Sequence, residues 1–109
     1  MEKRKPIQKE IQKMVKIIVE RFDPERIILF GSHARAEASL DSDVDLLVVM
    51  KVEGSKREKQ LELRTALHDI HVSKDIIISL PEEFEWRKEI VGTIERPAFR
   101  EGRVLYART

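Results

Sequence analysis

The most constraining feature of this 109-residue chain is the segment 44–50, in which every residue except Asp45 is apolar. A strand that carries apolar side chains at successive positions has both of its faces buried. The segment is far shorter than a membrane span and has the length of an ordinary strand. The sequence therefore predicts a strand at 44–50 that packs against other parts of the structure on both sides.

Three further segments have the composition of strands. Residues 26–30 are rich in Ile and Leu and lead directly into Gly31 and Ser32, which predicts a strand that ends in a tight turn. A similar apolar run covers 72–80, and a last, shorter strand is predicted at 103–107.

Helical patterns separate these strands. Apolar residues recur at steps of three and four from residue 7 to residue 22, which predicts an amphipathic helix that Asp23-Pro24 ends. A Ser-x-x-Glu capping signature begins a second helix at Ser55, and Pro81 with two following acids begins a third. Short helices are expected at 33–38 and 98–101. The second and third helices carry the apolar residues Leu61, Ala66, Leu67 and Ile70, and Phe84, Trp86 and Ile90, with Phe84 and Trp86 expected in the core.

This order of elements predicts one α+β domain over residues 1–109, with α/β character. It would have a small mixed sheet of about four strands and helices on one face. Hydrophobic residues make up 41% of the chain and charged residues 38%, which is typical of a soluble globular protein. No apolar run could span a membrane, and the absence of cysteine excludes disulfides and thiolate chemistry. We therefore expect a cytoplasmic protein.

The charges of the chain nearly cancel, with 21 basic and 20 acidic side chains giving a net charge of +1. Such a balance provides no general attraction to nucleic acid or to anionic lipid, so neither sequence-specific nucleic-acid binding nor membrane association is expected. The basic residues Lys3 to Lys5 are interpreted as a solvated helix start. His68 and His71 lack a third metal ligand and are interpreted as favourable cations near a helix end.

The candidate chemistry lies at the start of the 44–50 strand. Asp43 and Asp45 are two residues apart, so their side chains project from the same face. Like charges at that spacing repel, and a divalent cation between them would compensate. Carboxylate oxygens suit Mg²⁺, which in turn takes substrate phosphates as ligands. Asp41, in the preceding loop, is interpreted as an ordinary turn residue.

The turn at Gly31 supplies complementary groups for a phosphate. Glycine has no Cβ and permits close approach of the backbone, and Ser32 adds a hydroxyl at an expected helix start. Arg35 follows one helical turn later and is either a charge-assisted donor to the same anion or a solvated surface residue.

A third acid, Asp75, interrupts the apolar run of the third strand, where a carboxylate is costly unless it is paired or bound to metal. If this strand lies beside that of Asp43 and Asp45, three carboxylates converge on one face. Such a trio can hold two metal ions about 3.5 to 4 Å apart. A simple ion pair with Lys74 is the alternative.

These residues carry a resemblance to a known family. Gly31-Ser32, ten intervening residues and Asp43-x-Asp45, followed by an acidic strand, resemble the signature of the DNA polymerase β-type nucleotidyltransferase superfamily. At this length the chain is similar to the minimal nucleotidyltransferases, which are often encoded beside a HEPN-domain protein and act as its antitoxins. The final segment 99–106 is similar to the family's usual ending.

The resemblance implies a nucleotidyltransferase fold that binds a nucleoside triphosphate, with ATP as the expected donor. Gly31 and Ser32 would hold its β- and γ-phosphates, with Arg35 nearby. One position departs from the pattern, because many relatives have a glycine directly after the arginine of the turn and this chain has Ala36.

The resemblance also implies roles for the three acids. Asp43 and Asp45 would ligate both of two Mg²⁺ ions. Asp75 would bind the catalytic ion and help to accept the proton of the attacking hydroxyl, so that a nucleoside monophosphate is transferred and pyrophosphate leaves.

The implied acceptor is a protein, namely a HEPN-type toxin that would be inactivated by transfer of AMP to one of its hydroxyls. A non-catalytic antitoxin that masks its partner, and an aminoglycoside-type transferase for small molecules, are the alternatives; relatives of the latter kind carry an added substrate domain. Because side chains alternate between the two faces of a strand, Leu47, Val49 and Ile77 are expected on the same face as the acids. We expect a twin subunit or the partner protein to cover this apolar surface.

Overall fold

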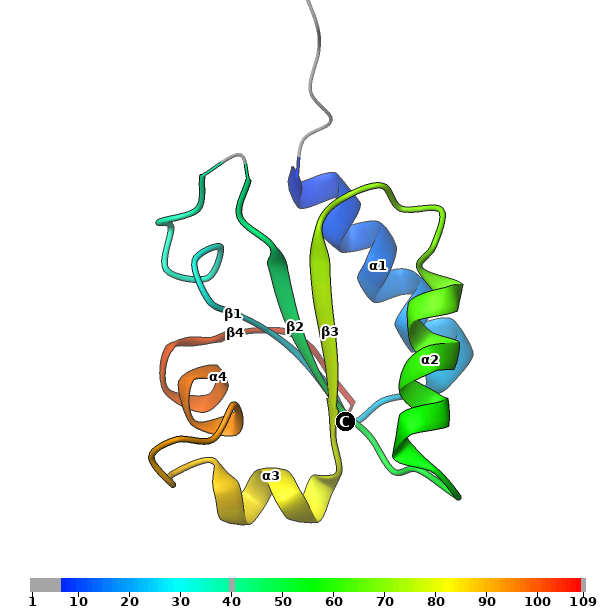
Figure 1. Ribbon diagram of the computed structural model, residues 1–109, viewed down its shortest axis with the longest axis vertical. Helices are drawn as coiled ribbons and strands as arrows, with labels where there is room; N and C mark the ends of the chain where they lie inside the picture. Colours follow the sequence, from blue (N-terminus) through cyan, green and yellow to red (C-terminus); the bar gives the residue numbers. More distant parts are fainter. Residues whose placement is uncertain (1–6, 40, 109) are drawn as a thin grey trace, which may run out of the picture.

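The computed structural model describes residues 7–39 and 41–108, and over these residues four helices surround a four-stranded mixed sheet (Figure 1). The strand order is β3-β2-β1-β4. The antiparallel pairs are β1 with β2 and β1 with β4, whereas β2 and β3 are parallel. The strands are β1 (Arg26–Phe30), β2 (Val44–Val49), β3 (Lys74–Ser79) and β4 (Arg103–Ala107). The predicted fold class is therefore confirmed.

Helices α1 (Ile7–Phe22) and α2 (Lys56–Ala66) cover one face of the sheet (Figure 1). The Ser55 hydroxyl caps α2 by accepting a hydrogen bond from the Glu58 N–H at 3.2 Å, as the capping signature predicts. Alternate residues of β2 point into this layer, in agreement with the predicted period of two. The main contributors to the layer are Ile11, Met14 and Ile18 of α1, Leu63 of α2, and Val44, Leu46 and Val48 of β2.

The opposite face of the sheet is covered by α3 (Pro81–Arg87) and α4 (Glu95–Glu101). Phe84 of α3 and Ala98 of α4 pack with Ile28, Leu47 and Val49 in a second buried cluster. Helices thus lie on both faces of the sheet rather than on one. The expectation that a second chain must cover the apolar residues beside the acids is wrong, because α3 and α4 of this chain cover Leu47 and Val49.

Two contacts fix α4 against the sheet. The buried Ser79 hydroxyl, at the end of β3, donates to the buried Glu95 carboxylate at 2.8 Å. At the other end of α4, a Cβ on Gly102 would collide with the Ala98 carbonyl oxygen and with the Ile28 side chain. A glycine at this position therefore allows α4 to approach β1 before the chain turns into β4.

Several helical residues lie elsewhere than predicted. Trp86 is 60% exposed, because the short helix α3 buries Phe84 alone among its residues and turns Trp86 outward. Ile90 lies beyond the end of α3 and is also exposed. Leu61 lies on α2 but points away from the sheet, and the final helix begins at Glu95 rather than at residue 98.

Within the described residues, no helix has both the length and the hydrophobicity needed to cross a bilayer.

The two aromatic residues of α3 provide a matched test of this packing. Phe84→Ala should lower the free energy of unfolding by about 3 to 5 kcal/mol, because Phe84 is 1% exposed and fills the second cluster. Trp86→Ala on the same helix should change it by less than about 1 kcal/mol. Urea unfolding followed by circular dichroism measures both, and equal losses would contradict the described orientation of α3.

Candidate active site

The site is built on the parallel pairing of β2 with β3. In that register Asp45 lies directly opposite Asp75, so the condition under which the sequence predicts that these acids converge is met. Both side chains point to the face that carries Leu47 and Ile77, away from α1 and α2. Asp75 is exposed, whereas Asp45 is partly buried. Two carboxylates therefore lie side by side at the start of these strands.

Asp43 lies just before β2 and is tied to the strand beside it. Its Oδ1 accepts a hydrogen bond from the Ser73 hydroxyl. The Val44 N–H also donates to the Ser73 carbonyl oxygen at 2.9 Å, which continues the β2–β3 pairing beyond the ends of the strands. Asp43 is thus brought to the same end of the sheet as Asp45 and Asp75.

The electrostatics of Asp45 show that the three acids interact. Partial burial raises the pKa of the Asp45 carboxyl above its ordinary value, and the charges of Asp75 and then Asp43 raise it further. His33 and Arg35 act in the opposite direction on the pKa of Asp45, since their positive charges favour its ionised form. The site therefore concentrates negative charge that a bound cation would relieve.

Gly31 lies against this cluster from the β1 side. Phe30 pairs with Asp45 across the two antiparallel strands, and the next residue, Gly31, has a φ of 76°. A Cβ on Gly31 would collide with the Asp45 carboxylate. Both the positive φ and the close approach therefore call for glycine. The sequence predicts that this glycine allows approach to a phosphate, and the structure places it against the Asp45 carboxylate.

The residues after Gly31 form a turn and not the predicted short helix. The Ala34 and Arg35 N–H groups both donate to the Gly31 carbonyl oxygen, at 3.1 and 3.2 Å. The backbone then takes a φ of 58° at Ala36, which ends any helical continuation. Ser32 accordingly does not stand at a helix N-terminus. The positive φ also explains why a glycine suits the position of Ala36, where many members of the resembling family have one.

Sequence reasoning missed several contacts around the turn and the acids. The His33 ring nitrogen Nε2 lies 3.2 Å from the Ser42 carbonyl oxygen, which ties the turn to the loop before Asp43. A single histidine in the sequence gives no signal for such a long-range bond. The guanidinium of Arg64, from α2, lies 3.9 Å from the Asp75 carboxylate, whereas Lys74, the partner considered from the sequence, donates to the backbone carbonyls of residues 70 and 72.

Arg35 is held by acidic side chains. Its Nε donates to Glu37 at 3.2 Å, and its Nη1 donates to Glu101 of α4 at 3.5 Å. These ion pairs are solvent-exposed and therefore weak, so they leave Arg35 free to exchange partners. Asp41, His68 and His71 are exposed and take part in none of the contacts just described.

The chemistry of the acids fits a hard cation, since three carboxylates supply only oxygen ligands. Their present arrangement is not a finished metal site. Among residues 7–39 and 41–108, no group of three or more His, Cys, Asp or Glu side chains is positioned to hold an ion. Asp43 is turned toward Ser73, so its carboxylate would have to rotate to join Asp45 and Asp75.

Known proteins share both the sequence pattern and the fold. The family described as "Polymerase beta, Nucleotidyltransferase" matches residues 12–109. Two proteins of Methanocaldococcus jannaschii, "Putative protein adenylyltransferase MJ0141" and "Putative protein adenylyltransferase MJ0604", are similar in sequence. The first is 38% identical over 72 residues, which are 65% of this chain and 70% of the relative. The second is 34% identical over 84 residues, 75% of this chain and 78% of the relative.

Solved structures extend the likeness in fold. A crystal structure described as a putative nucleotidyltransferase of Sulfolobus solfataricus superimposes with a TM-score of 0.64 at 22% identity, over 99% of this chain and 93% of the other. A toxin-antitoxin crystallised with AMP-PNP gives a TM-score of 0.55 at 17% identity, over 90% of this chain and 73% of the other. The chain therefore belongs to the polymerase β-type nucleotidyltransferase family.

The strained turn gives a first prediction. Ala36→Gly should raise the free energy of unfolding by about 1 kcal/mol, because glycine adopts a φ of 58° without the penalty of a Cβ. Ala38→Gly, two residues later and not at a positive φ, is the matched control and should be neutral or destabilising. Chemical denaturation measures both, and a loss of stability in Ala36→Gly would contradict the described turn.

The electrostatics of Asp45 give a second prediction, for protein kept in EDTA. The stability of the wild type should fall as the pH rises through the raised pKa of Asp45, because the folded state then has to ionise a carboxyl that burial and two acids disfavour. Asp45→Asn removes this loss and should melt at a higher temperature near about pH 7. The difference should disappear below the ordinary aspartate pKa, where the carboxyl is protonated in both states. The measurement is thermal unfolding of both proteins across this pH range. A lower melting temperature for Asp45→Asn than for wild type at neutral pH would contradict the raised pKa of Asp45.

Proposed function

We propose that the chain is a Mg²⁺-dependent adenylyltransferase that transfers AMP from ATP to a hydroxyl of a partner protein. The observation that carries the proposal is the pairing of Asp45 with Asp75 on adjacent parallel strands, with the backbone of Gly31 against Asp45. Membership of the nucleotidyltransferase family supports the reaction class. The names of the two archaeal relatives support a protein acceptor, and the AMP-PNP complex of a protein with this fold supports ATP as the donor.

In this proposal the turn binds the donor. Gly31 and Ser32 hold the β- and γ-phosphates, since the glycine allows the chain to approach an anion closely and the serine adds a hydroxyl donor. Arg35 leaves Glu37 or Glu101 to pair with the triphosphate, because a phosphate is a stronger partner than an exposed carboxylate.

The acids act on the acceptor side. The acceptor hydroxyl oxygen forms a bond to the α-phosphorus, the bond from that phosphorus to pyrophosphate breaks, and Asp75 takes the hydroxyl proton. Asp75 suits this role because it is exposed and stands at the open end of β3.

Asp43 and Asp45 would hold two Mg²⁺ ions, and Asp75 would help to hold the catalytic one, since carboxylate oxygens suit this cation. When bound, the ions would neutralise phosphate charge and stabilise the charge that develops during transfer. Their binding would also remove the repulsion that raises the pKa of Asp45. Rotation of Asp43 away from Ser73 completes the set of ligands.

The acceptor we propose is a HEPN-type toxin encoded beside this chain, which makes the chain an antitoxin. The likeness to a toxin-antitoxin structure supports this choice. The same likeness also favours a second candidate, an antitoxin that neutralises its partner by binding alone.

Label transfer separates the two candidates. The protein is incubated with Mg²⁺, α-labelled ATP and the HEPN-type protein of the neighbouring gene. Wild type should label that protein, and Asp43→Asn and Asp45→Asn should each lower the rate at least about 100-fold through loss of a metal ligand. Asp75→Asn should lower transfer similarly while ATP-analogue binding is kept, because it removes the proton acceptor.

Asp41→Asn is the matched control, since Asp41 is an exposed aspartate of the same loop. It should leave the rate within about twofold of wild type. Tight binding of the partner without label would support the masking antitoxin. Undiminished transfer in Asp43→Asn and Asp45→Asn would refute the metal assignment.

A further inference from the structure

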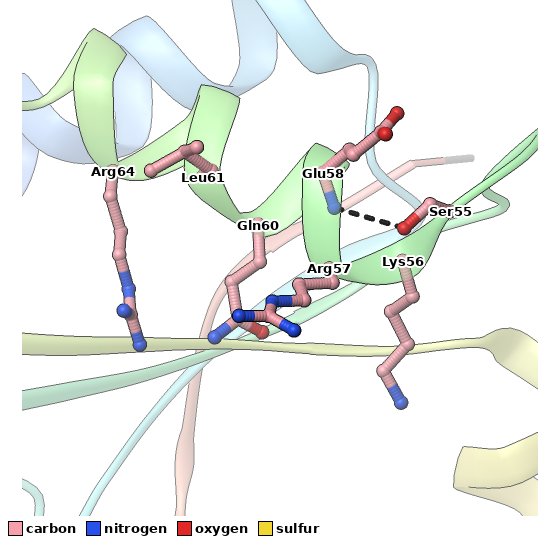
Figure 2. A pocket seen from close by; sticks show the side chains of 7 residues that line it. All are labelled: Ser55, Lys56, Arg57, Glu58, Gln60, Leu61 and Arg64. Atoms are coloured by element: carbon pink, nitrogen blue, oxygen red, sulfur yellow. Dashed lines mark hydrogen bonds between the residues drawn. The ribbon is translucent and has the colours of Figure 1, made fainter.

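A shallow cavity of about 780 Å³ lies along α2, outside the proposed catalytic residues. Figure 2 shows the side chains of Lys56, Arg57, Gln60 and Arg64 extending from the helix toward β3. Three of these four side chains are cationic at neutral pH. The cavity is therefore a basic surface, although the whole chain is almost neutral.

One row of these side chains holds α2 beside β3. Residues 56, 60 and 64 are each one helical turn apart and so form a stripe along the helix. The helix runs antiparallel to the strand, so Lys56 reaches α3 beyond the end of β3, whereas Gln60 and Arg64 reach β3 itself. The contacts are Lys56 with Glu83 at 2.9 Å, Gln60 with the Ile78 N–H at 3.4 Å, and Arg64 with Asp75 at 3.9 Å.

This arrangement covers part of the outer edge of β3, where the Gln60 side chain accepts a hydrogen bond from the Ile78 N–H. β3 is an edge strand, yet Ile76 and Ile78 are only 2% and 1% exposed. A covered edge does not offer the unpaired backbone groups that a partner strand would need. Any molecule in the cavity must therefore bind through the side chains of α2.

A second row of side chains remains available for such binding. Arg57 and Leu61 are one helical turn apart, both line the cavity and both are exposed, Leu61 at 65%. Arg57 forms no ion pair with an acidic side chain in the described part of the chain. Arg64 has one ionic partner, Asp75, at a distance of 3.9 Å. Two weakly engaged guanidinium groups thus flank an exposed leucine.

We infer that this surface docks an acidic segment of the acceptor protein, with an apolar side chain on Leu61 and carboxylates on Arg57 and Arg64. Guanidinium groups bind carboxylates through paired hydrogen bonds, so the charges are complementary. The inference rests on the proposed function. Because Arg64 also touches Asp75, a segment docked here ends beside the acid that would accept the proton. The cavity would therefore direct an acceptor hydroxyl into the active site.

The chemistry of the surface favours a protein over a nucleic acid. The exposed Leu61 has no role in binding phosphates, whereas it suits an apolar anchor of a protein segment. Interfaces of this kind depend on a few such residues.

Transfer kinetics with the HEPN-type protein of the neighbouring gene test the inference. Arg57→Glu should raise the KM for that protein at least about tenfold, because it places a like charge opposite an acidic segment. Leu61→Ala should raise the same KM about threefold or more through loss of apolar contact. The KM for ATP should stay within about twofold of wild type in both variants.

Two controls accompany these variants. Arg57→Lys keeps the charge and should lose less than Arg57→Glu does. Lys16→Glu makes the same charge change at an exposed position of α1 and should leave the KM for the protein unchanged. Thermal unfolding should show that all four variants fold, since the substituted side chains are at the surface.

Each outcome bears on one of the proposals. Wild-type kinetics for Arg57→Glu would overturn the docking inference and leave the proposed function intact. If the partner protein is neither bound nor labelled by wild type, both proposals fail. Binding of a short single-stranded RNA that Arg57→Glu abolishes, with no change in protein labelling, would reassign the surface to nucleic acid.

Discussion

The parallel pairing of β2 with β3 is the constraint on which the site depends. It sets Asp45 beside Asp75, which costs electrostatic free energy that the partial burial of Asp45 increases. The apolar residues between and after these acids hold the two strands together, because burial on both faces of β2 outweighs a local repulsion at one end. The fold can therefore keep negative charge concentrated at the start of β2 and β3.

Helices α3 and α4 cover only part of the face of β2 that carries the acid. The start of the strand faces the open site, whereas Leu47 and Val49 lie under α3 and α4. The Ser79–Glu95 hydrogen bond holds α4 in place, and Glu101 at its far end reaches Arg35. One short helix thus contacts both the packed end of the sheet and the turn that faces the acids.

The sequence predicted those features that depend on local patterns. The bounds of β1 and α1 agree with the structure, since both follow from apolar periodicity and clear breakers. Alternation of side chains and the rarity of acids in apolar strands singled out Asp45 and Asp75, whereas their adjacency was expected only if the two strands were neighbours, which the structure shows. The family resemblance added the roles of these residues, which geometry alone does not define.

Features that depend on distant parts of the chain could not be predicted in this way. Phe84 and Trp86 are both aromatic and stand two positions apart, so only the placement of α3 decides which of them is buried. The positive φ at Ala36 belongs to a residue type that gives no local signal for it. The contact of Arg64 with Asp75 joins two elements whose relative position the sequence did not specify.

The alternation along β2 has a consequence for how such a protein can vary. Asp45 lies between Val44 and Leu46, both fully buried on the opposite face. Deleting one residue within the strand would exchange the side chains on its two faces. The aspartate would then point into the apolar core, and a leucine would take its place on the face of the acids. Length changes in natural variants should therefore accumulate in the loop between the turn and Asp43, and the strand itself should keep an invariant residue count.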